Sequence, residues 1–100
     1  MTEPCLAEED LPHALGEADA SGWEPVGRRL IKAFACRGFV GALAFVEAVG
    51  VLAEEAEHHP DIDIRYDRVT LSLTTHDSGG ITRRDTALAG QIDRVTAGRS

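Results

Sequence analysis

Apolar and polar residues alternate along two neighbouring stretches in the second half of the chain. The apolar positions are Ile62, Ile64 and Tyr66 in the first stretch and Val69, Leu71 and Leu73 in the second. A period of two is typical of β-strands that bury one face. The residues left between them, Asp67 and Arg68, suit a two-residue turn. The pattern predicts a hairpin with Tyr66 opposite Val69 and Ile62 opposite Leu73, which places both apolar sets on one face.

A longer repeat of three and four residues predicts the main helix over residues 39–57. Its apolar positions are Phe39, Ala42, Val46, Val49, Ala53 and Ala56, with Phe45 and Leu52 beside them. Leu11, Leu15 and Ala18 predict a short first helix within residues 8–20. Thr82-Arg83-Arg84-Asp85 reads as a capping box that opens a third helix, with a core face formed by Leu88, Ile92 and Val95.

Two further strands are predicted before the main helix. Residues 23–26 form a short strand, and Pro25 makes it an edge strand because proline cannot donate to a ladder. Gly27-Arg28 is a turn, and residues 30–36 form a strand that is apolar on both faces. The whole order is α-β-β-α-β-β-α. It predicts an α+β fold, with a four-stranded antiparallel sheet and three helices packed on one face.

Composition fits one domain over residues 1–100, in which residues 1–7 lack periodicity and are expected to be mobile. The net charge of −7 argues against nucleic acid and anionic membranes as partners. The acidic start is unlike a signal peptide, and the longest apolar run, residues 39–53, is too short to span a bilayer. Cys5 and Cys36 show no metal or disulfide spacing, so we expect reduced thiols in a cytoplasmic protein.

Three of the four histidines, His58, His59 and His76, lie within residues 54–85. Imidazole can both give and take a proton near neutral pH. Pro60 favours an extended backbone at His59, so the pair should lie where the main helix ends. Extending the predicted hairpin places His76 opposite His59. Glu54 precedes His58 by one helical turn, where its carboxylate could hold that imidazole in one tautomer.

Simpler interpretations exist for each of these residues. His58 and His59 could be surface histidines, Asp85 only a helix cap, and Trp23 and Tyr66 core residues. Three histidines could also bind zinc, although adjacent residues rarely aim at one metal and no cysteine lies nearby. A nucleophilic site needs an activated Ser or Cys beside a base, and nothing marks a hydroxyl in this stretch as activated.

The spacing Glu54-x3-His58-His59-Pro60-x5-Tyr66-x9-His76-x8-Asp85 resembles the signature of the pterin-4a-carbinolamine dehydratases. The likeness extends from about Leu11 to Ile92. It implies the fold described above and removal of water from carbon 4a of a 4a-hydroxytetrahydropterin. The product is a quinonoid dihydropterin, which a reductase recycles for an aromatic amino-acid hydroxylase. The chemistry needs no metal and no cofactor, only acid and base groups.

The resemblance also implies roles for individual residues. We expect His58 and His59 to transfer protons and His76 to bind the hydroxylated carbon region, with Glu54 and Asp85 in support. The expected pterin contacts are Pro60, Thr75, Asp77 and Ser78. Family members form dimers or tetramers, and the apolar strand 30–36 and the main helix fit a homo-oligomer. The alternative is a non-catalytic binding module of the same fold, since some members act as dimerisation cofactors of a homeodomain transcription factor.

Overall fold

The computed structural model describes residues 3–99, and side chains for residues 3–96. Its elements are η1 (Glu8–Asp10), α1 (Leu11–Glu17), β1 (Glu24–Val26), β2 (Arg29–Ala35), α2 (Gly38–Ala56), β3 (Asp61–Arg65), β4 (Arg68–Leu73), η2 (His76–Ser78) and α3 (Arg83–Arg99). The predicted order of helices and strands is confirmed, with two short 3-10 helices added.

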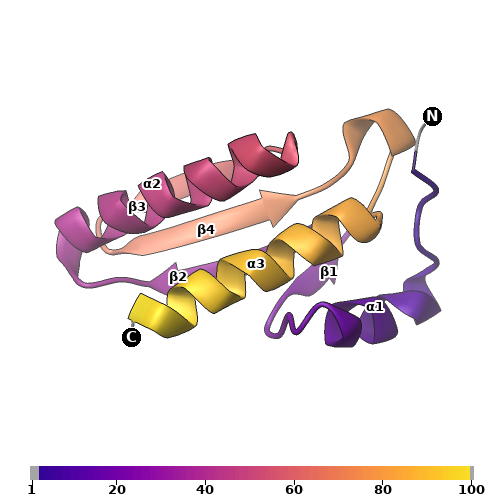
Figure 1. The fold of residues 1–100 in the computed structure, drawn as a ribbon, viewed down its shortest axis with the longest axis horizontal. Helices are drawn as coiled ribbons and strands as arrows, with labels where there is room; N and C mark the ends of the chain where they lie inside the picture. The colour runs from indigo at the N-terminus through magenta and orange to yellow at the C-terminus, as the bar shows by residue number, and fades with distance from the viewer. Residues whose placement is uncertain (1–2, 100) are drawn as a thin grey trace.

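The four strands form one antiparallel sheet in the order β1-β2-β4-β3, and the helices lie on one of its faces (Figure 1). The predicted α+β architecture is therefore confirmed. The strand with Pro25 is an edge strand, as expected, because β1 pairs only with β2. No helix in the described part of the chain is long and apolar enough to cross a membrane.

The predicted register of the second hairpin is wrong by two residues. Ile64 pairs with Val69 and Ile62 with Leu71. The turn consists of Tyr66 and Asp67 instead of Asp67 and Arg68. Tyr66 adopts a left-handed backbone with φ of 54° and is exposed, so its expected place in the core is also wrong. A shift of two residues keeps every side chain on its predicted face, which is why the alternation alone could not reveal it.

The core lies between the sheet and the helices. It includes Leu30, Phe34, Val69, Leu71 and Leu73 from the strands and Ala42, Phe45, Val49, Leu88 and Ile92 from the helices. The predicted core face of α2 is partly wrong, because Phe39 and Ala56 are exposed. Phe45, which was predicted to lie beside that face, is buried in the core. Trp23 is buried as predicted and packs edge-on against Phe34.

A close approach between two helices fixes the position of α1 against α3. A side chain at Gly90 would place its Cβ 2.0 Å from the backbone oxygen of Ala18. Any side chain at this position would overlap the Ala18 backbone, so only glycine fits. A second anchor is Asp93 of α3, which accepts hydrogen bonds from the Trp23 indole and from Lys32.

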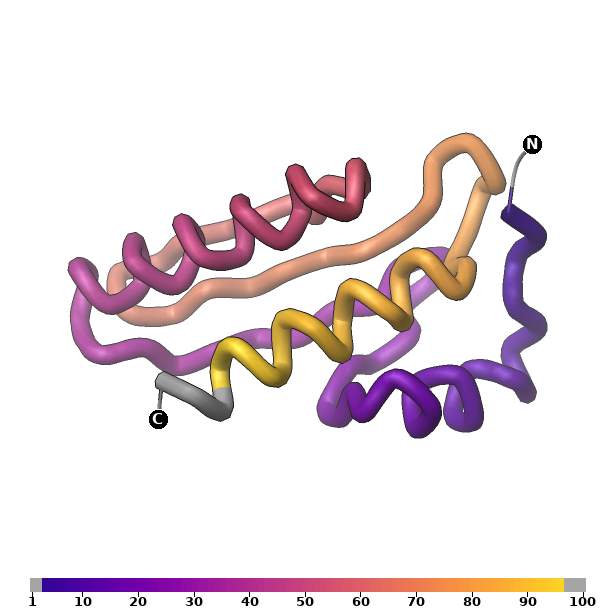
Figure 2. The backbone as a smooth tube through the Cα atoms, viewed as in Figure 1, coloured from indigo at the N-terminus to yellow at the C-terminus, as the bar shows by residue number. Residues whose placement is uncertain are grey.

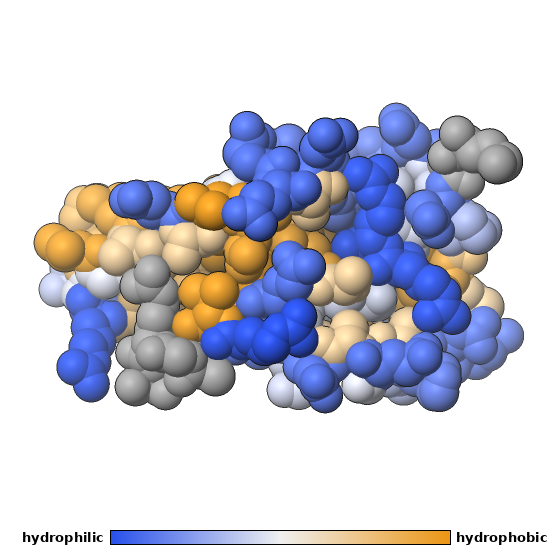
Figure 3. Space-filling model, in the orientation of Figure 1, coloured by the Kyte–Doolittle hydropathy of each residue, from blue (hydrophilic) through white to orange (hydrophobic). Residues whose placement is uncertain are grey.

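One surface of the molecule is unusually apolar. Apolar side chains gather at the end of the molecule where α2 begins, whereas the end that carries η2 is polar (Figure 3). The large exposed apolar side chains of this surface are Phe39, Val40, Leu43 and Val51 of α2 and Ile62 and Ile64 of the edge strand β3. We refer to this set as the α2–β3 surface.

Candidate functional site

His58 lies just beyond the end of α2 and is held there by the way the helix terminates. Glu57 adopts a left-handed conformation with φ of 51°, and the backbone N–H of His58 donates to the carbonyl of Ala53 at 3.0 Å. This arrangement is a common helix ending. Because the chain turns out of the helix at Glu57, His58 no longer shares a face with Glu54. The expected Glu54–His58 contact is therefore absent, and the His58 ring turns into the protein, where it is buried.

The partner of the buried His58 ring is Asp85 of α3. Nε2 of His58 lies 2.5 Å from Oδ1 of Asp85, whose side chain is fully buried. The other carboxylate oxygen, Oδ2, accepts hydrogen bonds from the Thr75 hydroxyl and the Thr82 backbone N–H, both at 2.9 Å. A carboxylate that accepts from three donors is held in a single orientation. Asp85 thus caps α3, as the capping box predicted, and also orients the imidazole, a role that the sequence analysis had given to Glu54.

The adjacent histidine has a different environment. His59 is exposed, and its Nε2 contacts the carboxylate of Glu54, which is also exposed. Glu54 therefore supports His59, and not His58 as predicted. An exposed ion pair of this kind contributes little to stability. Its role in the site is to set the direction in which the His59 ring points.

The third histidine comes from a different segment of the chain. His76 begins η2, and Thr74 and Thr75 separate it from the end of β4 at Leu73. A pocket of about 230 Å³ is lined by Glu57, His58, His59, Thr74, Thr75, His76, Asp77 and Arg84. We call this the histidine pocket. The three predicted catalytic histidines line it together, as do the predicted contact residues Thr75 and Asp77.

Two other predicted contact residues, Pro60 and Ser78, do not line the histidine pocket. The Ser78 hydroxyl donates to the backbone carbonyl of Glu3, and the Ser78 carbonyl accepts from the thiol of Cys5. The N-terminal segment thus runs beside η2 (Figure 2). The expected mobility of residues 1–7 stays a prediction, because residues 1–2 lie outside the described residues.

Glu57 and Arg84 also line the pocket and were not predicted from the sequence. Glu57 occupies the left-handed helix end, and the Arg84 guanidinium donates to the Glu57 backbone carbonyl at 2.8 Å. This bond ties the end of α2 to the start of α3. The sequence signal for Arg84 was its place beside Asp85 in the capping box, which gives it no partner outside α3.

The arrangement can give and take protons at two places on one small molecule. A neutral imidazole whose Nε2–H donates to a carboxylate carries its lone pair on Nδ1 and can act as a base. The same carboxylate stabilises the imidazolium that forms. His59 and His76 supply further donors or acceptors on the open side of the pocket. No group of three or more His, Cys, Asp or Glu side chains within the described residues is arranged to hold a metal ion.

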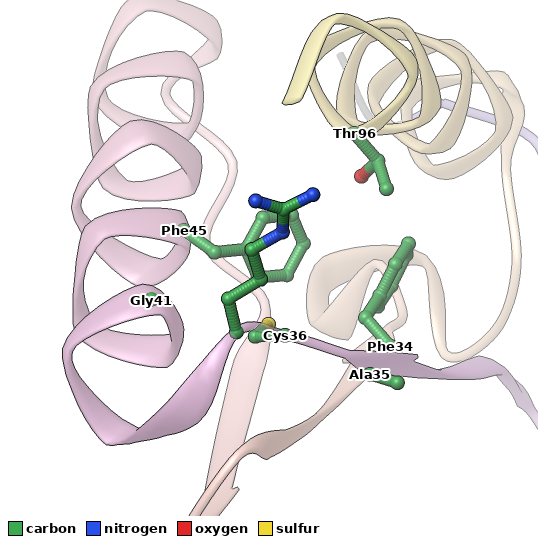
Figure 4. Close-up of a pocket in the computed structure, with 7 residues that line it drawn as sticks. Phe34, Ala35, Cys36, Gly41, Phe45 and Thr96 are labelled. Carbon is green, nitrogen blue, oxygen red and sulfur yellow. The ribbon is translucent and has the colours of Figure 1, made fainter. Parts of the chain in front are cut away.

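A second, larger pocket of about 490 Å³ lies elsewhere and shares no lining residue with the histidine pocket. Phe34 of β2, Phe45 and Gly41 of α2 and Thr96 of α3 surround it (Figure 4). Its described lining also includes Ala35, Cys36 and Arg37. That lining offers no histidine and no carboxylate, so proton transfer of the kind described above is a property of the smaller pocket.

Known proteins of one family resemble this chain over most of its length. Residues 4–95 match the family described as pterin 4 alpha carbinolamine dehydratase. A protein of Roseiflexus sp. (strain RS-1), whose name assigns it provisionally to the pterin-4-alpha-carbinolamine dehydratases, is 50% identical over 90 residues. That match covers 90% of this chain and 95% of the relative.

Two solved structures share the fold. The crystal structure of a transcriptional coactivator/pterin dehydratase from Brucella melitensis is 28% identical with a TM-score of 0.82. It covers 91% of this chain and 97% of that chain. A pterin dehydratase-like protein, identified as a RuBisCO assembly factor in the alpha-carboxysome, is also 28% identical. Its TM-score is 0.61, and the match covers 78% of this chain and 89% of that chain.

Proposed function

This chain belongs to the pterin 4 alpha carbinolamine dehydratase family, and we propose that it removes water from a 4a-hydroxytetrahydropterin by histidine acid–base catalysis. The observation that carries the proposal is the histidine pocket, in which a buried His58–Asp85 pair faces two exposed histidines. In the reaction the C4a–O bond breaks, the hydroxyl leaves with a proton as water, and N5 loses its proton. The products are a quinonoid dihydropterin and water.

His58 is the better candidate for the base that takes the N5 proton. Its Nε2 is bound to Asp85, which leaves Nδ1 to accept, and the carboxylate 2.5 Å away offsets the positive charge that develops on the ring. His59, exposed and paired with Glu54, then protonates the leaving hydroxyl. His76, which also lines the pocket, binds the hydroxylated region of the ring.

The contacts of the pterin are proposed on the same basis. Thr75 and Asp77 line the pocket, and Arg84 lies at its rim with a guanidinium that can meet a carbonyl oxygen of the ring. Pro60 and Ser78 remain predictions without a pocket contact. Neither a metal nor a cofactor is needed for this dehydration, since acid and base groups suffice.

The experiment compares single alanine variants of His58, His59 and His76 in a stopped-flow dehydration assay with synthetic 4a-hydroxytetrahydropterin. His13→Ala is the matched control, because His13 is exposed on α1, pairs with Glu17 and does not line the histidine pocket. The alanine changes at His58 and His59 should each lower kcat by roughly 10-fold to 1,000-fold, within the usual range for acid–base groups. A folded His59→Ala variant with full activity would contradict the mechanism.

A binding module of the same fold is the second candidate, because the relative with a TM-score of 0.61 is described as a RuBisCO assembly factor. An intact acid–base pocket is not needed for such a role, and its presence favours the enzyme. The discriminating observation is turnover by the purified chain. A chain that accelerates dehydration no more than its His58→Ala variant does would favour the binding role.

The α2–β3 surface supports a homodimer or homotetramer. It combines four large apolar side chains of α2 with an edge strand whose outer backbone groups have no strand partner within the described residues. Edge strands and apolar patches of this kind are the usual places where copies of a chain meet. A cytoplasmic location also stays our prediction, because the spacing of Cys5 and Cys36 suits neither a disulfide framework nor a metal site.

A further inference from the structure

Another pocket adjoins the histidine pocket and has two lining residues in common with it. It has a volume of about 390 Å³ and is lined by Val26, Gly27, Arg28, Arg29, Thr74, His76 and Gly79. We call it the Arg28 pocket. Thr74 and His76 line both pockets. A ligand with its ring system in the histidine pocket can therefore extend a substituent past His76 into the Arg28 pocket.

The wall that carries Arg28 is fixed by the turn between β1 and β2. Val26 pairs with Arg29, so Gly27 and Arg28 form a two-residue hairpin turn, for which the positive φ of Gly27, 61°, is suited. The hydroxyl of Thr74 donates to the Arg28 carbonyl at 2.7 Å. The Arg28 guanidinium reaches the Gly79 carbonyl at 3.4 Å, a long and weak bond. The backbone of Arg28 is thus held firmly, while its charged group is only loosely engaged.

The charge of this pocket is opposite to that of the whole chain. Its lining contains two arginines and a histidine but no aspartate or glutamate, in a chain with a net charge of −7. The Arg29 guanidinium is already paired with Asp61 at 2.6 Å. Among the described residues, Arg28 forms no ion pair with a carboxylate. Its positive charge is therefore available to a ligand.

We propose that the Arg28 pocket binds a phosphate group carried on the side chain of the pterin substrate. This inference rests on the proposed dehydratase function, because it places the pterin ring in the histidine pocket. A guanidinium binds phosphate oxygens through charge-assisted hydrogen bonds, often two at once. A phosphate monoester carries close to two negative charges at neutral pH, and Arg28 and His76 can both donate to it. The chain would thus select phosphorylated pterins over pterins with small neutral substituents.

The test uses two synthetic 4a-hydroxytetrahydropterins, one with a methyl group and one with a phosphorylated hydroxymethyl group as the side chain. Arg28→Gln removes the charge and leaves the backbone bond to Thr74 intact. Arg65→Gln is the matched control, because Arg65 is exposed on β3, pairs with Asp63 and does not line the Arg28 pocket. We expect Arg28→Gln to raise KM for the phosphorylated pterin about 10-fold to 100-fold, in line with loss of charged hydrogen bonds. KM for the methyl pterin should change less than about two-fold.

Equal KM values of the wild-type chain for the two pterins would overturn the inference, and so would an Arg28→Gln variant with an unchanged KM for the phosphorylated one. Failure of the proposed function has a different signature, since the wild-type chain would then dehydrate neither pterin. Binding of the stable oxidised pterins, followed by quenching of pterin fluorescence, measures the site without turnover. Tighter binding of the phosphorylated pterin that disappears in Arg28→Gln supports the Arg28 pocket whether or not dehydration is seen.

Discussion

Replacing Asp85 with asparagine changes one atom of the site and separates its two roles. In the wild-type chain, Oδ2 of Asp85 lies 2.9 Å from both the Thr75 hydroxyl and the Thr82 backbone nitrogen. The side-chain oxygen of asparagine can take the place of Oδ2 and still accept from both donors. Its NH₂ group then faces Nε2 of His58, where a carboxylate oxygen stands at 2.5 Å in the wild-type chain. Because an NH₂ group only donates, Nε2 must become the acceptor and the proton of the neutral ring moves to Nδ1.

The altered tautomer can no longer accept a proton on the atom that we assign to catalysis. We expect kcat to fall by about 10²-fold to 10⁴-fold, the range seen when a base is lost or held in the wrong tautomer. The free energy of unfolding should fall by only about 1–3 kcal/mol, because the two hydrogen bonds that cap α3 persist and one charged bond is lost. The assay combines steady-state dehydration kinetics with unfolding in urea.

Asp93→Asn is the matched control in the same helix. Asp93 accepts hydrogen bonds from Trp23 and from Lys32, at 2.8 Å for the latter, and lies outside the histidine pocket. This change should lower stability by a similar amount and leave kcat within about two-fold of wild type, as expected for a charged bond without a catalytic role. A folded Asp85→Asn variant with the same kcat as Asp93→Asn would show that the Asp85 carboxylate does not set the reactive tautomer of His58.

Three further predictions concern the fold, the third histidine and assembly. In urea titrations, Gly90→Ala should lower the free energy of unfolding by about 3 kcal/mol, since the new Cβ would clash with the Ala18 backbone oxygen. Gly16→Ala is the control and should raise the free energy of unfolding by about 0.5 kcal/mol, because its new Cβ meets no other atom. His76→Ala should raise KM more than it lowers kcat; the reverse split in steady-state kinetics would make His76 an acid or base. The wild-type chain should sediment as a dimer or tetramer at micromolar concentration, and Val40→Glu, but not the control Val26→Glu, should shift it towards monomer. A monomeric wild-type chain would count against the α2–β3 surface.

Much of the fold follows from local patterns in the sequence. Alternation and the helical repeat located the strands and helices, and Thr82 and Asp85 marked the start of α3 correctly. The hairpin register could not be derived in this way, because two registers that differ by two residues bury the same faces. The observed one needs a left-handed Tyr66, a conformation that sequence reasoning would give to aspartate or glycine first.

The sequence indicated part of the candidate site but not its pairings. The three histidines line one pocket, and the buried Asp85 binds His58 without lining that pocket itself. Glu54 was paired with His58 on the assumption that the helix continues, whereas the left-handed turn at Glu57 moves His58 off that face. The contact between Arg84 and the end of α2 joins two helix ends that are distant in sequence, so no local pattern could predict it.

A single-turnover experiment shows whether the histidine pocket of this chain catalyses the dehydration. Purified chain, in excess over synthetic 4a-hydroxytetrahydropterin, is mixed with it in a stopped-flow instrument, and formation of the quinonoid dihydropterin is followed by absorbance. The wild-type chain should accelerate the reaction far above the spontaneous rate. The folded His58→Ala, His59→Ala double variant should lose about as much rate as the more damaging single change, because the effects of residues that act as a unit are not additive. A wild-type chain that leaves the spontaneous rate unchanged, or a double variant as fast as wild type, would contradict catalysis by this pocket.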